Sequence, residues 1–318
     1  MTNVPVSDKY CFTLSDQYGT LARDELRESD EIRDQSLAQI RDWIAKNAAI
    51  KFCRSDSSFL LRFLRVRKFN HLAACESVER YLVMRQRYAD WFRKLDTTQA
   101  WVDEMIDDWP ILPLGYDEIG RLLILIKMGN FDLKKFVNVD QIRMMMMILE
   151  SYYEEERVQI AGSVFILDST GLTMSHIAQW PLSDIKNFVD CVNHTFPLRI
   201  KEVHTVNLPR YAIAVSELCV SFASPKLKKR IHCHRSIDDL IKHVKLASLP
   251  KEYGGEVPIN TFKHNLRVLL SKHRSTILNL DQMAVDLSTC LVLKENSSQS
   301  GLKNDSGVVG SFRKLNVD

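Results

Sequence analysis

Apolar positions in the first third of the chain recur at steps of three and four residues, the spacing of an amphipathic helix. We expect helices over residues 13–48 and 71–92, with a further helix between them in the segment SDSSFLLRFLRVRKFN. Asp56 or a neighbouring serine can cap this middle helix, because such side chains accept hydrogen bonds from free backbone N–H groups. Its apolar face consists of Phe59, Leu60, Phe63 and Leu64. Residues 1–98 are therefore predicted to form an all-helical lobe.

The pattern changes after Pro110, where continuous apolar runs of strand length begin to alternate with helical segments. The runs RLLILIK and GSVFILD lack the polar alternation of a half-exposed strand, so we expect both to be covered on two faces. The predicted strands cover 121–127, 162–168, 199–206 and 229–234, and the predicted helices between them include 139–157 and 183–193. This order is typical of an α/β sheet with some parallel pairing, and we place the domain at residues 99–260.

Residues 207–223 are predicted to form a helix that is apolar on more than one side. Asn207 can cap its first turn, where Pro209 is tolerated, and Pro225 ends it. Its main apolar stripe consists of Leu208, Tyr211, Val215, Leu218 and Phe222. Four cations follow at once, namely Lys226, Lys228, Lys229 and Arg230. An apolar helix with a basic hinge suits a moving cover over an apolar space, close to something anionic, better than it suits catalysis.

The end of the chain changes character once more. A last helix is predicted over 264–275, inside a helical extension that we place at 261–295. Ser, Gly and Asn are prominent in residues 296–318, which is typical of a disordered tail.

Composition and charge narrow the class of protein. The 318 residues are 45% hydrophobic and 26% charged, and the net charge of +3 is too small to indicate a nucleic-acid partner. Seven scattered cysteines without a CxxC pair favour free thiols in a reducing compartment. The first twenty residues lack the apolar core of a signal peptide, and the longest apolar run is far shorter than a bilayer span. We therefore expect a cytoplasmic protein.

Catalytic and cofactor motifs are missing, since the sequence has no GxGxxG, Walker or GxSxG pattern. Asp168 ends a buried strand, but capping the following turn is the favoured interpretation because no nucleophile–base pair accompanies it. His232 and His234 share one face of a strand, yet two ligands without a second cluster do not complete a zinc site. We expect no enzyme, no metal and no cofactor. A hydrolase-like enzyme that uses Asp168 or His232 remains the alternative.

The helix predicted over 139–157 contains four consecutive methionines, Met144 to Met147. Methionine is an ordinary core residue, but it also adapts to irregular apolar ligands better than branched side chains do. From the residues alone, a solid core and an internal lipid cavity are therefore equally open.

Five segments resemble one family, in its order and without large gaps: FLLRFLRVRKF (59–69), FILDSTG (165–171), FPLRIKEVHTVNLP (196–209), KLKKRIHCH (226–234) and LPKEYGGE (249–256). They resemble the CRAL-TRIO (Sec14-like) lipid-transfer proteins, over about residues 40–275. The branch of vitamin E (alpha-tocopherol) and retinaldehyde carriers, with its insect homologues, is the most similar. The resemblance implies a helical lobe packed on an α/β lobe, whose mixed, largely parallel sheet helps to enclose one hydrophobic ligand. It also implies that residues 207–223 are a mobile gate helix.

The same resemblance implies roles for basic residues. In the vitamin E carrier branch, cations beside the gate hold a phosphoinositide headgroup at the membrane. The matching positions are Arg67, Arg199, Lys201, Lys226 and Arg230, and all five are basic here. Arg62 is expected to brace the two lobes instead, and Arg65 to lie on a solvated helix face.

The lipid cavity implied by position is lined by Ile142, Met145, Leu149, Leu167, Cys191, Val192, Leu198, Val203, Val215 and Leu218. The vitamin E carrier has hydroxyl side chains where Met145 and Leu149 stand, so tocopherol itself is not the favoured cargo. We expect a monomeric carrier that loads one retinoid, tocopherol-like or other apolar lipid and exchanges it at phosphoinositide-containing membranes, where it is bound transiently. The alternative is a phosphoinositide-binding membrane adaptor without a dedicated cargo.

Overall fold

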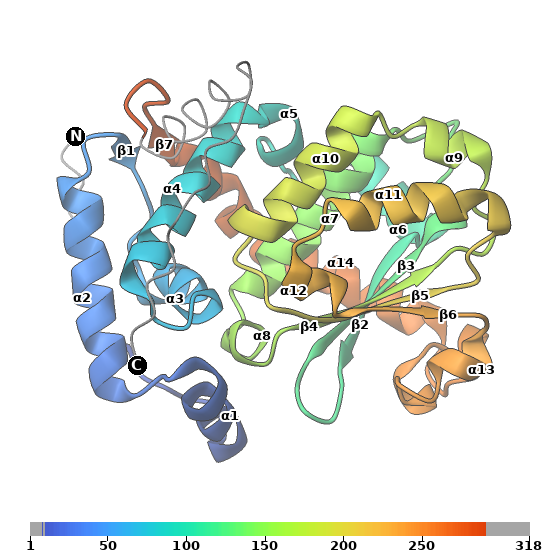
Figure 1. Cartoon of the computed structure of the whole chain (residues 1–318), viewed down its shortest axis with the longest axis horizontal. Coiled ribbons are helices and arrows are strands. Elements are labelled where there is room, and N and C mark those ends of the chain that lie inside the picture. The colour runs from blue at the N-terminus through green and yellow to red at the C-terminus, as the bar shows by residue number, and fades with distance from the viewer. Residues whose placement is uncertain (1–7, 9, 291–318) are drawn as a thin grey trace, which may run out of the picture.

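The computed structural model describes Asp8 and residues 10–290, which form two lobes that lie side by side (Figure 1). The first lobe is built from helices of the N-terminal third, and the second is a five-stranded sheet flanked by helices. The expected fold class, an all-helical lobe followed by an α/β lobe, is confirmed. The tail expected to be disordered at 296–318 lies outside the described residues.

The helical lobe contains α2 (Asp30–Lys46), α3 (Ser57–Val66), α4 (His71–Arg87) and the short α5 (Ala89–Phe92). Asp56 caps α3, because its carboxylate accepts a hydrogen bond from the backbone N–H of Phe59 at 3.1 Å. Phe59, Phe63 and Tyr81 pack edge to face, with ring centroids 5.3 to 6.0 Å apart. The apolar face expected for α3 therefore joins α4 in one aromatic core.

The single helix expected over 13–48 is wrong. The chain instead forms α1 (Asp16–Leu21), a π-helical turn (Ala22–Leu26) and, after a break, α2. Arg27 has a φ of 65°, in the left-handed region that ends a helix. Ser29 then starts α2 by accepting a hydrogen bond from the N–H of Ile32 at 3.2 Å. The helix expected over 71–92 divides in the same way, into α4 and α5.

The sheet has the strand order β2-β3-β4-β5-β6. Its strands are β2 (Ile111–Tyr116), β3 (Leu122–Lys127), β4 (Ser163–Asp168), β5 (Ile200–Val206) and β6 (Ile231–His234). The last four are the expected strands, and they run parallel. The antiparallel edge strand β2 was not predicted, because Pro113 and Gly115 interrupt its apolar run, and its register with β3 shifts between them.

Helices cover both faces of this sheet (Figure 1). On one face lie α7 (Asn138–Tyr153), α10 (Leu182–Asp190) and α11 (Ile213–Ser221), and α13 (Ile237–Leu240) lies on the other. The remaining helices are α6 (Ala100–Asp108), α8 (Glu156–Ala161), α9 (Met174–Ala178), α12 (Pro225–Lys228) and α14 (Ile259–Asn279). Because side chains alternate along a strand, Val203 and Thr205 of β5 point toward α11, and His204 points to the opposite face.

After the sheet, the chain returns to the helical lobe. Helix α14 is longer than the helix expected over 264–275, and it packs on α6, α7 and β2. Strand β7 (Ala284–Val285) then pairs antiparallel with β1 (Ile50–Phe52). Strands of two or three residues show no measurable period, so the sequence analysis missed this pair.

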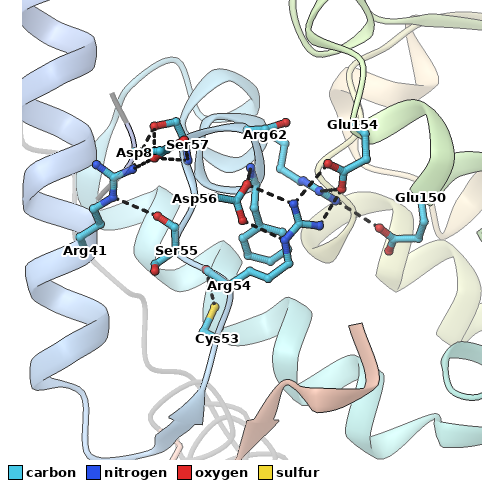
Figure 2. A network of polar contacts seen from close by, with 12 residues as sticks. Asp8, Arg41, Cys53, Arg54, Ser55, Asp56, Ser57, Arg62, Glu150 and Glu154 are labelled. Atoms are coloured by element: carbon cyan, nitrogen blue, oxygen red, sulfur yellow. Dashed lines mark hydrogen bonds and ion pairs between the residues drawn. The ribbon is translucent and has the colours of Figure 1, made fainter. Parts of the chain in front are cut away.

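Arg62 of α3 joins the two lobes, as Figure 2 shows. Its guanidinium donates to Glu150 at 3.1 Å and to Glu154 at 2.7 Å, both at the end of α7. Arg54 donates to the same Glu154 at 2.7 Å. The expected brace is confirmed.

The expectation for Arg65 is wrong, because this side chain is not on a solvated face. Arg65 is 1% exposed, and its guanidinium donates to the Glu28 carboxylate at 2.7 Å and to the Gln159 side chain at 2.9 Å. A buried guanidinium needs such partners to offset its lost hydration. Arg65 therefore ties the chain before α2 and the helix α8 to α3.

Candidate functional site: an apolar cavity beside a cluster of cations

Two adjoining apolar cavities, of about 360 and about 260 Å³, lie between the sheet and the helices α7, α10 and α11. The first extends toward α9, and the second extends toward Leu198 and Leu227. Both cavities are bordered by Ile126, Met145, Leu167, Phe188, Val189, Thr205, Ser216 and Cys219. They form one space with two compartments. Its size is in the range of pockets that bind small molecules.

The methionine run of α7 contributes to both core and cavity. Met144, Met146 and Met147 are at most 1% exposed and do not border either cavity. Met145 borders both compartments. Met144, Met146 and Met147 are therefore core residues, whereas Met145, on the same helix, is a residue of the cavity wall.

Eight of the ten residues expected to line the cavity border it: Ile142, Met145, Leu149, Leu167, Val192, Leu198, Val203 and Val215. Cys191 and Leu218 do not. Cys191 is buried elsewhere, and Leu218 is 41% exposed on the outer face of α11. Ser216 and Cys219 border the cavity from this helix instead. Helix α11 has apolar residues on more than one side and a single charged residue, Glu217, so its periodicity did not decide on which side Leu218 lies.

Aromatic side chains that were not predicted form part of the wall, namely Phe131, Trp180 and Phe188 in the first compartment and Phe165, Phe188 and Phe196 in the second. Trp180 and Phe188 pack edge to face with ring centroids 6.2 Å apart. Phe188 lies in the helix expected over 183–193, so a helical projection of that segment could have indicated it. Phe131 and Trp180 lie between regular elements, where no period identifies a wall residue.

Some polar groups on the cavity wall are hydrogen-bonded to the protein, and others have no partner. Gln141 accepts a hydrogen bond from the indole N–H of Trp180 at 3.2 Å, and the Nε2 atom of His176 lies 3.0 Å from the carbonyl oxygen of Phe131. The hydroxyls of Thr205 and Ser216 have no hydrogen-bond partner among the described residues. These two residues come from the sheet and from α11, and both border both compartments. They are free to contact a polar group of a ligand.

The covering helix is shorter than the one expected over 207–223, because the chain first forms a 3₁₀ turn at Arg210–Ala212. Asn207 does not cap it. This residue has a φ of 57°, and its amide donates to Asp168 at 3.0 Å. Asp168 also accepts from the N–H of Thr170 at 3.0 Å and from the hydroxyl of Tyr253 at 2.6 Å. Burial opposes ionisation, but the hydrogen bonds from Tyr253, Thr170 and Asn207 lower the pKa of Asp168. The expected capping role of Asp168 is confirmed.

The far end of α11 is held by Asn193. Its side chain donates to the carbonyl oxygen of Phe222 and accepts from the N–H of Ser224, both at 3.0 Å. Pro225 does not end α11, which stops at Ser221, but is the first residue of α12. A few side-chain contacts thus hold α11, among them the hydrogen bond from the Tyr211 hydroxyl to the carbonyl oxygen of Leu172, and the helix has no buried residue of its own.

The outer side of α11 exposes large apolar side chains beside the charged Glu217. Ile213 is 42% exposed and Leu218 is 41% exposed, and Tyr211 just before the helix is 50% exposed. Among residues 10–290, no helix combines the length and the apolar character that crossing a bilayer would require. Exposed apolar side chains that stand together on one helix mark an interaction surface.

The five expected cations come from separate segments but gather beside the end of α11. Arg67 donates to the hydroxyl of Ser77 at 2.6 Å and to the carbonyl oxygen of His194 at 2.8 Å. Arg230 donates to the carbonyl oxygen of Ile200. Burial lowers the pKa of Lys226, and the charges of Arg230, Lys68, Arg199 and Arg67 lower it further. Lys68 is a sixth member that the sequence analysis missed.

Two members of this cluster have an acidic partner that was also missed. The guanidinium of Arg199 lies 2.6 Å from the Glu25 carboxylate, and the ammonium of Lys201 donates to the same oxygen. Burial lowers the pKa of Arg199 and of Lys201, and the contact with Glu25 only partly offsets this. The contact joins residues more than 170 positions apart, so no local pattern could indicate it.

His232 and His234 belong to a stack of four imidazoles on the sheet face opposite the cavity. Ring centroids of His204 lie 5.3 Å from His232, 5.1 Å from His234 and 5.9 Å from His243. In the part of the chain that the structure describes, no three His, Cys, Asp or Glu side chains are arranged to hold a metal ion. Within the stack, Nδ1 of His204 lies 2.9 Å from Nε2 of His234, and Nε2 of His204 lies 3.0 Å from the Glu202 carboxylate.

Known proteins resemble this chain in sequence. Residues 107–255 match the family model described as the CRAL/TRIO domain. Clavesin-2 of Homo sapiens is 30% identical over 239 residues, which cover 74% of this chain and 73% of that protein. Clavesin-1 of Mus musculus is 30% identical over 295 residues, which cover 91% and 83%. The solved structure of Sfh5 superposes with a TM-score of 0.48 at 12% identity, covering 84% of this chain and 99% of that one.

Proposed function

The chain belongs to the CRAL/TRIO (Sec14-like) family of lipid-binding proteins, and we propose that it carries one hydrophobic lipid and exchanges it at membranes that contain phosphoinositides. One observation carries this proposal: an apolar cavity lies under a lightly held helix, with a cation cluster at the end of that helix. The cavity receives the lipid, α11 is the gate, and the cluster binds the headgroup. Each step is a binding step rather than a chemical one.

Burial of the lipid chain drives loading. Each buried CH₂ contributes up to about 0.8 kcal/mol, so a lipid of roughly twenty carbons leaves an apolar cavity only slowly without help. The two compartments meet where the free hydroxyls of Thr205 and Ser216 stand. We therefore expect a cargo that is apolar over most of its length and has one hydrogen-bonding group near its middle.

Release requires α11 to move. Its ends are held by side-chain contacts of Asn207, Tyr211 and Asn193, and α11 itself contributes no buried residue to the core. Ile213 and Leu218 on the outer face can enter the headgroup region once the protein meets a membrane. A Lys or Arg near an anionic surface contributes about 1 kcal/mol, so the cluster orients this face toward the bilayer.

Headgroup binding would then favour the open gate. Lys226 and Arg230 lie on the segment that directly follows α11, so a phosphate that draws them outward also pulls on the end of the gate. A ligand shifts such an equilibrium only by the difference in its affinity for the two states. A phosphoinositide that binds the open form better than the closed form would couple membrane contact to release.

A membrane adaptor without a dedicated cargo is the second candidate. It is favoured by one observation, namely that none of the five cations borders either cavity. A headgroup could therefore bind whether or not the cavity is filled.

Native mass spectrometry of the purified protein, followed by organic extraction, tests the two candidates. A single apolar lipid at near one-to-one stoichiometry supports the carrier and identifies its cargo class. An empty cavity or a mixture of ordinary phospholipids contradicts the carrier and supports the adaptor. Transfer of the extracted lipid between donor and acceptor vesicles, faster with phosphoinositide in the acceptor, tests the exchange step separately.

A further inference from the structure

A carboxylate already occupies part of the cation cluster. The Oε2 atom of Glu25 lies 2.6 Å from Nη2 of Arg199 and also accepts a hydrogen bond from Nζ of Lys201. Three other cations of the cluster form no ion pair within residues 10–290, namely Arg67, Lys226 and Arg230. One pair of cations is thus neutralised, and the cations beside it are not.

Glu25 is held in this position by its neighbours. It belongs to the π-helical turn Ala22–Leu26, in which Leu26 is fully buried against Ile160. Glu28, just after the turn, accepts a hydrogen bond from buried Arg65 at 2.7 Å. The backbone is therefore fixed on both sides of Glu25, whereas its own side chain is 36% exposed. A change of rotamer suffices to remove the carboxylate from the cations.

We propose that Glu25 is a built-in counter-ion that holds the place of a phosphate, so that a headgroup must displace it to reach Arg199 and Lys201. The inference rests on the proposed phosphoinositide site. A phosphomonoester brings a charge of about −1.5 to −2 and three acceptor oxygens. A phosphodiester or a lipid carboxylate brings one negative charge, which is no more than Glu25 already supplies. A ligand must therefore bring more negative charge than one carboxylate to displace Glu25 favourably, and phosphomonoesters meet this condition.

The burial of the two cations explains why a counter-ion is needed in the unliganded protein. Arg199 and Lys201 have side chains only 11% and 20% exposed, so leaving both without an anion would be unfavourable. A purely structural counter-ion would have the same location but the opposite consequence. Its removal would weaken the site, whereas removal of a place-holder strengthens ligand binding.

The test compares Glu25→Gln with Asp24→Asn. Asp24 is exposed, makes no ion pair within residues 10–290 and loses the same charge on substitution. The probes are soluble inositol trisphosphate, measured by titration calorimetry, and vesicles containing phosphatidylinositol bisphosphate or phosphatidylserine, measured by flotation.

We expect Glu25→Gln to raise the affinity for both phosphorylated probes roughly tenfold, as two partly buried ion pairs no longer compete. Binding to phosphatidylserine vesicles should become measurable. Asp24→Asn should change each affinity less than about twofold.

Equal affinities of the two variants, or a lower affinity of Glu25→Gln, would overturn the counter-ion role. Glu25→Asp keeps the charge but retracts the carboxylate, so it should show an intermediate gain even if Glu25→Gln is poorly stable. In an Arg199→Ala background, the gain in affinity from Glu25→Gln should shrink, because the contact between Glu25 and Arg199 is already broken. An undiminished gain also overturns the counter-ion role.

If wild type and Glu25→Gln both fail to bind any phosphorylated probe, the proposed phosphoinositide site itself is wrong. A response to the vesicles but not to the soluble probe would assign the site to lipid headgroups.

Discussion

Three arginines at α3 lie within six residues of one another and have different surroundings. Arg62 and Arg65 are each 1% exposed and contact carboxylates of other elements, Glu150 and Glu28 among them. Arg67 contacts only neutral oxygens within residues 10–290, and its charge lies near that of Lys226. Nothing in the spacing of FLLRFLRVRKF separates the two kinds.

The three arginines differ both in burial and in charge compensation, and we propose that compensation separates the structural cations from the cations proposed to bind a headgroup. Burying a cation with its anion adds little net stability, but it fixes which elements meet. Gathering cations without anions costs free energy through their mutual repulsion, and an anionic ligand removes that cost. By this criterion, Arg199 is intermediate between the structural cations and the proposed binding cations, because the carboxylate of Glu25 partly compensates its charge.

The largest expected effect comes from Arg65→Ala. This change leaves Glu28 buried without its main partner, so we expect the free energy of unfolding to fall by about 3 kcal/mol. Arg67→Ala, at the residue that follows the same helix, is the matched control and should lower it by less, because Arg67 loses two hydrogen bonds to neutral oxygens but no ion pair. Urea denaturation measures both. Equal losses of unfolding free energy in the two variants would show that charge compensation does not distinguish the two arginines.

Lys226→Ala combined with Arg230→Ala should have the next largest effect, on membrane binding. Two cations near an anionic surface contribute about 2 kcal/mol, so affinity for phosphoinositide vesicles should fall roughly thirtyfold. Cargo affinity should stay nearly unchanged, since neither residue borders the cavity. Lys228→Ala with Lys229→Ala removes the same charge from the adjoining exposed positions and serves as the control. An equal loss in both double variants would attribute binding to net charge alone, and a parallel loss of cargo affinity would assign the pair to the fold.

The histidine stack offers a smaller effect that depends on pH. Burial is the first cause that lowers the pKa of His204 and of His234 below the ordinary value of 6.5, and neighbouring imidazoles add to it. Glu202, which also pairs with Arg121, and Asp239 oppose this shift. The unfolded chain therefore binds these protons more readily than the folded one, so stability should fall as pH drops below about 6.5.

Melting curves between pH 7.5 and 5.5 measure this loss, which we expect to be a few degrees. His273 has a lowered pKa for a similar reason, burial followed by the charge of Lys272. His204→Phe isolates the stack and should flatten the pH dependence, whereas His273→Phe should leave most of it. A curve that His204→Phe does not alter would mean that the stack does not control acid stability.

The smallest expected effect concerns the free hydroxyls of the cavity. Thr205→Val keeps the shape of the side chain and removes one hydrogen bond to a cargo, which is worth about 1 kcal/mol or roughly fivefold in affinity. The loss should appear with a lipid that carries a hydroxyl or carbonyl group and be absent with a plain hydrocarbon of the same length. Competition with a fluorescent lipid measures both. Ser216→Ala should behave alike, and an equal loss for the hydrocarbon would indicate a packing effect instead.

The parallel strands and the existence of a helix within 207–223 were predictable because each has a local pattern of apolar residues. Runs such as RLLILIK are covered on both faces, and continuous apolar character identifies them without any knowledge of their neighbours. Elements without such a pattern were missed or misjudged. Strand β2 is interrupted by Pro113, and the helix expected over 13–48 breaks at Arg27 and Glu28, residues with no helix-breaking signature.

The candidate site also contains residues that the sequence indicated and residues that it did not. The five cations all lie within the family motifs, whereas only Leu167, Leu198 and Val203 of the expected cavity residues do, and the other expected wall residues came from their positions between the motifs. The motifs could not identify Glu25, which meets Arg199 only because the first helices fold back over the start of β5. Leu218 was assigned to the wrong side of α11, since a helix with apolar residues on more than one side has an ambiguous inward face until the sheet below it is in place.

The sequence by itself determined the α/β class, the order of the parallel strands along the chain and the family, because local period and short motifs carry that information. The tertiary structure alone decided which charges are compensated. Arg62, Arg65 and Arg67 have the same charge and nearly the same neighbours in sequence, but compensation depends on carboxylates contributed by distant segments. Pairing between charges is a property of three-dimensional distance, and the order of residues does not fix it until the chain has folded.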